Sequence, residues 1–292
     1  MATNLNIETV TDIVISAIGQ HGEITDRQRE LMTALVRHLH DFCRETKLQH
    51  DEFLYTCEFL ARTGQMCSEK RQEFILLGDI LGVEILVDML SNPTEEGGSD
   101  SCILGPFYRE NPPVLPKGAS TVQMAFEGQE TVYFEGHVLD ADGKPLEGVL
   151  LDVWEDAPNG LYENHDPNQP EYNLRGRFIT DEKGHFAFRA LRPVPYPIPN
   201  DESAGELIRA MGHHPFRPGH IHFMIAKEGY RPFISQVFDS SSDYLEEDSV
   251  FAVKQSLIAD FKPAPEGIDQ DLYVNFDFVL TRAAKETALA AE

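Results

Sequence analysis

The spacing of apolar residues changes near residue 91, and this change constrains the fold more than any other feature of the chain. Before that point apolar residues recur every three or four positions, the period of an amphipathic helix. After it they alternate with polar residues, as in a half-buried strand. The sequence between, SNPTEEGGS at 91–99, breaks a helical pattern. We therefore expect an α+β fold class, with an N-terminal helical domain over residues 1–98 and an all-β sandwich over 99–292.

Three helices are predicted in the first part. Thr25 and Gln28 have the spacing of a capping box, and the apolar spacing continues from there to Cys43. A second helix is expected near 51–62 and a third near 69–90. The third is apolar around most of its circumference, which favours burial against a second copy of the chain. A homodimer is thus expected, and a central helix in a monomeric bundle is the alternative.

Short strands are predicted in the second part, over 131–139, 149–154, 176–180, 185–188, 220–226, 233–238 and 272–280. The turn sequence DEKG at 181–184 indicates that the strands on either side of it form a hairpin.

Composition limits the possible partners and the location. The formal charge is −25, with 49 acidic residues against 24 Lys and Arg, so nucleic acid and anionic membrane surfaces are improbable partners. The four cysteines form no C-x-x-C pair. The first residues lack the charge and apolar core of a signal peptide, and no apolar run could cross a bilayer. We expect a soluble cytoplasmic protein.

The motif His220-Ile221-His222 is the strongest chemical signal. Residues two apart on a strand point to the same face, so both imidazoles can reach one metal ion. Such a pair alone is a weak signal, because two histidines on an exposed strand are common. Burying two imidazoles without a common partner would, however, be costly. Two tyrosines stand out as further candidates: Tyr162 ends the loop after a strand, and Tyr196 lies in a proline-stiffened segment. For each alone, a packing role is the alternative.

Taken together, these segments resemble the intradiol ring-cleavage dioxygenases, the family of catechol and hydroxyquinol 1,2-dioxygenases. The resemblance spans nearly the whole chain, and its motifs are GLY at 160–162, PYPIP at 195–199, RPGHIH at 217–222, LGPFY at 104–108 and GHVLD at 136–140. It implies a mononuclear non-haem ferric ion, a small aromatic diol or triol and dioxygen as substrates, and a homodimer with bound amphipathic lipid. Phenolate and imidazole donors suit ferric iron.

The resemblance also implies roles for particular residues. The metal ligands would be Tyr162, Tyr196, His220 and His222, with Tyr196 displaced when substrate binds. Arg217 would stabilise charge on the substrate ring, and Gln236 would form hydrogen bonds near the iron. A surface ion pair and an exposed strand position are the respective alternatives. The implied substrate pocket consists of Leu76, Asp79, Ile103, Leu104, Gly105, Pro106, Phe107, Ile198, Pro199 and Val250.

Asp79 bears on the choice of substrate. It shares a predicted helical face with the apolar Leu76, Val83 and Leu86, where a carboxylate is out of place. Hydroxyquinol enzymes resemble this chain in carrying Asp there, and a carboxylate could accept a hydrogen bond from a third ring hydroxyl. We therefore expect benzene-1,2,4-triol as substrate, cleaved to 3-hydroxy-cis,cis-muconate and its tautomer maleylacetate. Catechol or a chlorocatechol is the alternative.

Two other classes of protein remain open. The segment 136–154 also resembles transthyretin-like sandwiches, which include binding modules without enzymatic activity. A zinc-dependent hydrolase is a third class, for which two histidines without a carboxylate or cysteine ligand form a poor set. His213 and His214 are adjacent in sequence and point in different directions, so neither is expected to bind the metal. The surrounding segments, 201–205 and 212–215, do not follow the family's usual sequence.

Overall fold

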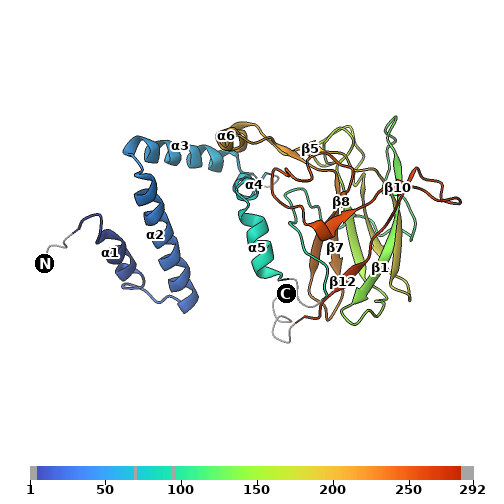
Figure 1. The fold of residues 1–292 in the computed structure, drawn as a ribbon, viewed down its shortest axis with the longest axis horizontal. Coiled ribbons are helices and arrows are strands. Elements are labelled where there is room, and N and C mark those ends of the chain that lie inside the picture. Colours follow the sequence, from blue (N-terminus) through green and yellow to red (C-terminus); the bar gives the residue numbers. More distant parts are fainter. Residues whose placement is uncertain (1–4, 69–70, 94–96, 284–292) are drawn as a thin grey trace. The chain divides into compact units, whose positions relative to one another are not determined.

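A computed structural model describes residues 5–68, 71–93 and 97–283 (Figure 1). The chain divides into two compact units, Met1–Gln65 and Met66–Glu292. The helices are α1 (Val10–Ala17), α2 (Asp26–Thr46), α3 (His50–Met66), α4 (Glu73–Ile80), α5 (Val83–Ser91) and α6 (Glu202–Met211). Helices precede a part rich in β-strands, which confirms the expected fold class.

The capping box at the start of α2 is present. The backbone N–H of Gln28 donates to the Thr25 hydroxyl at 3.1 Å, and the backbone N–H of Thr25 donates to the Gln28 side chain at 2.8 Å. These two bonds satisfy N–H groups that have no partner within the helix, so the helix begins where the sequence predicted. The helix α1 was not predicted, nor was α6.

The single helix predicted over 69–90 is wrong: α4 and α5 are separate, and residues 69–70 lie outside the described residues. The break is at Gly82, whose φ of +65° is a left-handed conformation that glycine adopts without strain. Asp79 and Leu76 are 2 % and 4 % exposed, whereas Val83 and Leu86 are about half exposed. The buried face predicted to contain all four therefore ends before Val83.

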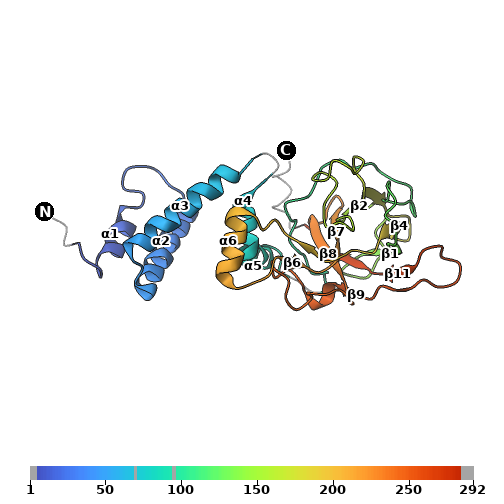
Figure 2. The ribbon, with the colours of Figure 1, turned by 90° about the horizontal axis from the view of Figure 1, so that it is seen from above.

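The second unit contains two five-stranded sheets as well as α4, α5 and α6 (Figures 1 and 2). In one, the order is β10-β11-β1-β12 and β4 also pairs with β1; in the other it is β3-β2-β7-β8-β9, and β5 and β6 pair separately. The strands are β1 (Thr131–Asp140), β2 (Leu150–Trp154), β3 (Arg175–Ile179), β4 (His185–Leu191), β5 (Tyr196–Pro197), β6 (Phe216–Arg217), β7 (His220–Ala226), β8 (Phe233–Asp239), β9 (Ile258–Ala259), β10 (Lys262–Pro263), β11 (Leu272–Asn275) and β12 (Phe278–Leu280).

The predicted hairpin at 181–184 is wrong. Strand β3 pairs with β2 and β4 pairs with β1, so the turn connects the two sheets. The connection lets both strands cover the same core: Phe178 of β3 and Phe188 of β4 stack with ring centroids 5.3 Å apart. The strand predicted over 272–280 is also interrupted, because the Asp277 side chain, rather than a backbone carbonyl, accepts the N–H of His137 at 2.7 Å.

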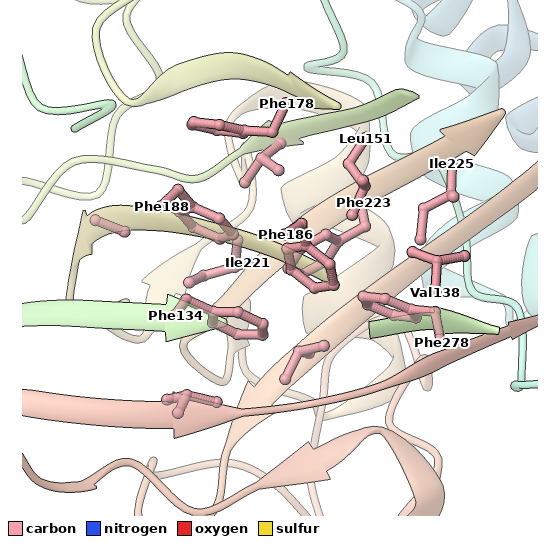
Figure 3. Packing of buried hydrophobic residues seen from close by; sticks show 14 of the residues in the cluster. Phe134, Val138, Leu151, Phe178, Phe186, Phe188, Ile221, Phe223, Ile225 and Phe278 are labelled. Atoms are coloured by element: carbon pink, nitrogen blue, oxygen red, sulfur yellow. The ribbon is translucent and has the colours of Figure 1, made fainter. Parts of the chain in front are cut away.

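The main core lies between the two sheets and is rich in phenylalanine (Figure 3). Phe134, Phe188 and Phe223 are fully buried there. Strand β7 contributes Ile221, Phe223 and Ile225, which alternate along the strand and all face this core. The residues between them must face the other way. Within the described residues, no helix has the length and apolar character needed to cross a membrane.

Candidate active site

His220 and His222 lie on the face of β7 opposite the core, and both are at most 1 % exposed. Their Nε2 atoms are 3.1 Å apart. The Nδ1–H of His220 donates to the carbonyl of Pro218 at 2.7 Å, which leaves a lone pair on Nε2. Burial lowers the pKa of both imidazoles well below 6.5, and the charge of Arg217 lowers it further. Both rings are therefore neutral, the form that binds a metal.

Tyr162 and Tyr196 complete the group. The hydroxyl of Tyr162 lies 3.2 Å from Nε2 of His222, and the rings of Tyr162 and Tyr196 meet edge to face with centroids 5.8 Å apart. Gly160, with φ of +75°, makes the turn before Tyr162, and a Cβ there would lie 3.4 Å from Cβ of Tyr196. Both rings are 2 % exposed. Burial raises the pKa of both phenols, so without a cation they keep their protons.

These four side chains fit a ferric ion. Two neutral imidazole nitrogens and two phenol oxygens converge in a region closed to water, and oxygen donors that become anionic suit a trivalent ion. Within the described ranges, no group of three or more His, Cys, Asp or Glu residues could hold a metal ion. The donor set of a typical zinc site is thus missing from this part of the chain.

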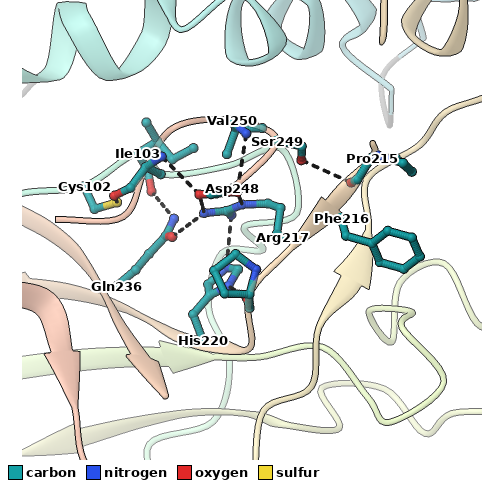
Figure 4. Close-up of polar contacts among 12 residues, drawn as sticks. Cys102, Ile103, Pro215, Phe216, Arg217, His220, Gln236, Asp248, Ser249 and Val250 are labelled. Carbon is teal, nitrogen blue, oxygen red and sulfur yellow. Dashed lines mark hydrogen bonds and ion pairs between the residues drawn. The ribbon is translucent and has the colours of Figure 1, made fainter. Parts of the chain in front are cut away.

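Arg217 is buried beside this group, on β6, and connects its His220 to two other side chains, Asp248 and Gln236 (Figure 4). Its Nε and Nη2 donate to the two oxygens of Asp248 at 3.0 and 3.2 Å. Its Nη1 donates to Nε2 of His220 at 3.0 Å. Burial alone would lower the pKa of Arg217, but the Asp248 carboxylate more than offsets this and the pKa is raised. The arginine is a fixed cation in the interior, so the surface ion pair considered as its alternative does not apply.

Gln236 is fully buried on β8, opposite His222 in the strand pairing. It accepts from Nη2 of Arg217 at 2.8 Å and donates to the carbonyl of Ile103 at 2.9 Å (Figure 4). The exposed strand position considered as its alternative is excluded. Gln236 holds Arg217 in place and joins it to the segment that begins at Ile103.

A narrow pocket lies beside these residues, and its cavity volume is about 10 Å³. Such a volume holds about one water molecule, so an aromatic ring fits only when the walls of the pocket move apart. Its lining includes Tyr196, Arg217 and His222 together with most of the predicted pocket residues: Leu76, Asp79, Ile103, Gly105, Pro106, Phe107, Ile198 and Val250. Pro199 lines an adjoining outer pocket, and Leu104 packs against the hydrophobic cluster around the site. His213 and His214 lie elsewhere, next to Phe251 and Tyr244.

Two residues of this region were missed from sequence. Trp154 stacks on the His222 ring, with centroids 4.7 Å apart and planes within 9°. It could have been found, because a lone tryptophan ending a strand next to the tyrosine loop is conspicuous. Asp248 neutralises Arg217. Nothing in the sequence distinguished it from the other carboxylates around it, although a buried arginine requires one.

The chain is similar over most of its length to known proteins. The family model described as "Dioxygenase" matches residues 103–282, and that described as "Catechol dioxygenase N terminus" matches residues 25–99. A catechol 1,2-dioxygenase of Candida albicans is 41 % identical, with 94 % of this chain and 90 % of that protein covered. A hydroxyquinol 1,2-dioxygenase of Rhizobium sp. is 39 % identical, with 88 % and 90 % covered.

The fold is likewise shared with solved structures. A hydroxyquinol 1,2-dioxygenase from Pseudomonas putida DLL-E4 superposes with a TM-score of 0.89 at 36 % identity, covering 95 % of this chain and 99 % of that one. From the matching family models, the relatives and the shared fold, we conclude that this chain belongs to the intradiol ring-cleavage dioxygenase family.

Proposed function

We propose that this chain is a ferric non-haem dioxygenase that cleaves benzene-1,2,4-triol between its two adjacent hydroxyl-bearing carbons. One carbon–carbon bond breaks, both atoms of dioxygen enter the product, and the ring is opened to 3-hydroxy-cis,cis-muconate, the tautomer of maleylacetate. The observation that carries the proposal is the convergence of Tyr162, His220 and His222 beside a pocket that Asp79 lines.

Tyr162, Tyr196, His220 and His222 would hold the iron. When bound, iron supplies a Lewis acid that holds the two adjacent hydroxyls and makes the ring reactive toward dioxygen. The burial of all four side chains excludes water that would compete for the metal. Tyr196 lines the pocket and pairs with Arg217 in the β5–β6 ladder, so as a phenolate it would be placed to take a proton from a substrate hydroxyl.

Arg217 would act on the substrate ring, and Gln236 would hold Arg217 in place. The guanidinium lines the pocket and is held by Asp248 and Gln236, so its charge has a fixed direction. A fixed cation stabilises negative charge that develops on a ring, and it needs no rearrangement to do so. Gln236 does not line the pocket and would act through Arg217.

The choice of triol rests on Asp79. It is 2 % exposed, and its Oδ1 has no hydrogen-bond donor. A buried acceptor without a donor is unfavourable, and a third ring hydroxyl would provide one. Hydroxyquinol 1,2-dioxygenases among the relatives are consistent with this substrate. The second candidate is catechol, favoured by the 41 % identity to the Candida albicans enzyme and by the apolar remainder of the pocket.

Oxygen uptake with benzene-1,2,4-triol, catechol and 4-chlorocatechol tests both candidates, with mass spectrometry of the products. The proposal expects one dioxygen consumed per triol and the highest kcat/KM for that substrate. Asp79→Ala should reduce kcat/KM for the triol at least tenfold and leave that for catechol nearly unchanged. Equal losses on both substrates would remove Asp79 from substrate selection, and higher kcat/KM for catechol in the native protein would favour the second candidate.

We further propose that two chains associate through the helical residues 1–98 and that residues 99–292 supply the iron ligands. This proposed division at residue 98 follows function and differs from the boundary between the compact units, which lies at Met66. Leu76 and Asp79 belong to the helical residues 1–98 and still line the pocket. Large apolar side chains of α2 are about half exposed in one chain, namely Leu31, Met32, Leu35, Leu39 and Phe42. Light scattering should give the mass of a dimer, and Leu39→Asp should give monomers whereas Glu45→Gln should not. A monomer at micromolar concentration would contradict the dimer.

An amphipathic lipid would bind in the first unit. A pocket there has apolar walls and two cations, Arg44 and Lys47, and its lining consists of Ile7, Val10, His40, Cys43, Arg44, Lys47, Leu48 and Gln49. Such a lining suits an acyl chain with an anionic headgroup. Native mass spectrometry of the purified protein should show added mass that organic extraction removes, and its absence would contradict lipid binding.

A further inference from the structure

Asp79 is not alone in the pocket wall. It lies one residue before the end of α4, and its carboxyl group interacts with the side chain of Glu84, in the first turn of α5. The turn between the helices brings the two together: the N–H of Gly82 donates to the carbonyl of Asp79 at 2.9 Å, and the chain then reverses through the left-handed conformation of Gly82. Two carboxyl groups five residues apart thus meet at the edge of the pocket.

Among the described residues, no donor supplies a hydrogen bond to the two buried oxygens of this pair. Oδ1 of Asp79 and Oε2 of Glu84 are both buried, and neither has an N–H or O–H partner. The contact between the two groups therefore becomes a hydrogen bond only if one carboxyl group holds a proton. Two ionised carboxylates in contact and out of water repel each other, so such pairs share one proton.

The other charges that face the pair do not replace this proton. Among the side chains that act on Asp79, Arg217 is the cation and Asp248 is the anion besides Glu84. Arg217 is already neutralised by Asp248 through two hydrogen bonds, so little of its charge remains to hold a second carboxylate. Burial, followed by the contact with Glu84, raises the pKa of Asp79 to about 9. The proton accordingly resides on Asp79 at neutral pH.

We propose that Asp79 meets the substrate as a neutral carboxylic acid, its proton donated to Glu84, and that Glu84 is a positioning residue for substrate selection. The hydroxyl of the acid is directed at Glu84, so its carbonyl oxygen is left for the third hydroxyl of the substrate. A ring whose hydroxyls lose protons on binding a cation carries negative charge, and an ionised Asp79 would repel it. The neutral acid accepts the same hydrogen bond without that repulsion. This inference rests on the proposed function.

Four variants test it, with the ratio of kcat/KM for benzene-1,2,4-triol to that for catechol as the readout. Asp79→Asn preserves a neutral acceptor and a group that donates to Glu84, so the ratio should stay within about threefold of the native value, whereas Asp79→Ala should lower it at least tenfold. Glu84→Gln retains an acceptor for the Asp79 proton and should also stay within about threefold. Glu84→Met removes that acceptor, frees the Asp79 hydroxyl to point into the pocket, and should lower the ratio at least tenfold. Glu182→Gln, at an exposed turn, is the matched control.

The outcomes are distinct. If Asp79→Asn lowers the ratio as much as Asp79→Ala, Asp79 acts as a carboxylate and the inference is overturned. If Glu84→Met leaves the ratio unchanged, Glu84 has no role in selection. Turnover of catechol and iron content should stay native in both Glu84 variants, which a merely structural role would not predict.

A readout independent of activity is the infrared difference spectrum of native protein minus Asp79→Asn. It should contain the carbonyl stretch of a protonated carboxylic acid that shifts in deuterated water, and its absence would overturn the inference. Failure to consume oxygen with any diol would instead refute the proposed function, and the infrared result would still decide the state of the pair.

Discussion

Removing the carboxylate from the buried Arg217–Asp248 pair should destabilise the protein strongly. Both side chains are 2 to 4 % exposed, and two hydrogen bonds join them. Unit charges about 4 Å apart attract by about 4 kcal/mol at an effective dielectric constant near 20. Breaking such a pair from one side leaves an uncompensated buried charge and costs about 3–5 kcal/mol. Asp248 also accepts from the N–H groups of Val250 and Ala252, so Asp248→Asn should lie within this range or slightly above it.

The assay is urea unfolding of iron-free protein at pH 7, because bound iron would add its own stabilisation. The double variant Arg217→Met/Asp248→Leu replaces both charges with apolar groups and should lose much less than Asp248→Asn. Asp260→Asn removes one partner of an exposed ion pair with Lys262 and should leave the unfolding midpoint unchanged. A loss below about 1 kcal/mol for Asp248→Asn would refute the reasoning, since Arg217 could then tolerate burial without its counter-ion.

Two further predictions concern stability. Burial raises the pKa of Asp152 from 3.8 to about 7, so the folded protein holds this proton more tightly than the unfolded chain, and its free energy of unfolding falls as pH rises between those values. Asp152→Asn lacks this loss, so between those pH values its free energy of unfolding should rise relative to that of the native protein by an amount on the order of 3 kcal/mol. Unfolding titrations at several pH values measure the difference. A constant difference between the two proteins would contradict the assignment. Thr25→Ala removes the cap of α2 and should lower the free energy of unfolding of the helical part by about 1 kcal/mol, measured by circular dichroism. No change would mean that the cap bonds are replaced by water.

The secondary structure was predictable where one local signal dominated. The capping box placed the start of α2, and alternation along 220–226 gave β7 with its bounds. Prediction failed where a single residue or a distant partner decides. One glycine split the long apolar helix into α4 and α5, and the turn after Ile179 connects two sheets because β4 pairs with β1. Turn sequences specify how the chain reverses and do not specify which sheet it enters.

The candidate site was likewise predictable where the signal was local and was missed where a distant partner decides. The histidine pair was recognisable from its spacing and the tyrosines from their loops, since these features are local. The partners that set their environment come from far along the chain: Asp248 lies 31 residues from Arg217, and Trp154 lies 68 residues from His222. Glu84 is close to Asp79 in sequence, but on the continuous helix predicted there the two would not face each other. Only the break at Gly82 brings them together.

Visible absorption of the iron-loaded protein tests the tyrosine and histidine centre most directly. Ferric phenolate absorbs in the visible through charge transfer, so protein with one iron per chain should be red-brown. Tyr162→Phe should lose or strongly shift the band. Tyr273→Phe is the control and should keep the band, because the Tyr273 hydroxyl donates to Glu135 in the sheet of β1 and β11, which does not contain the histidines of β7. A colourless protein carrying one ferric ion per chain, or a band unchanged by Tyr162→Phe, would contradict the proposed centre.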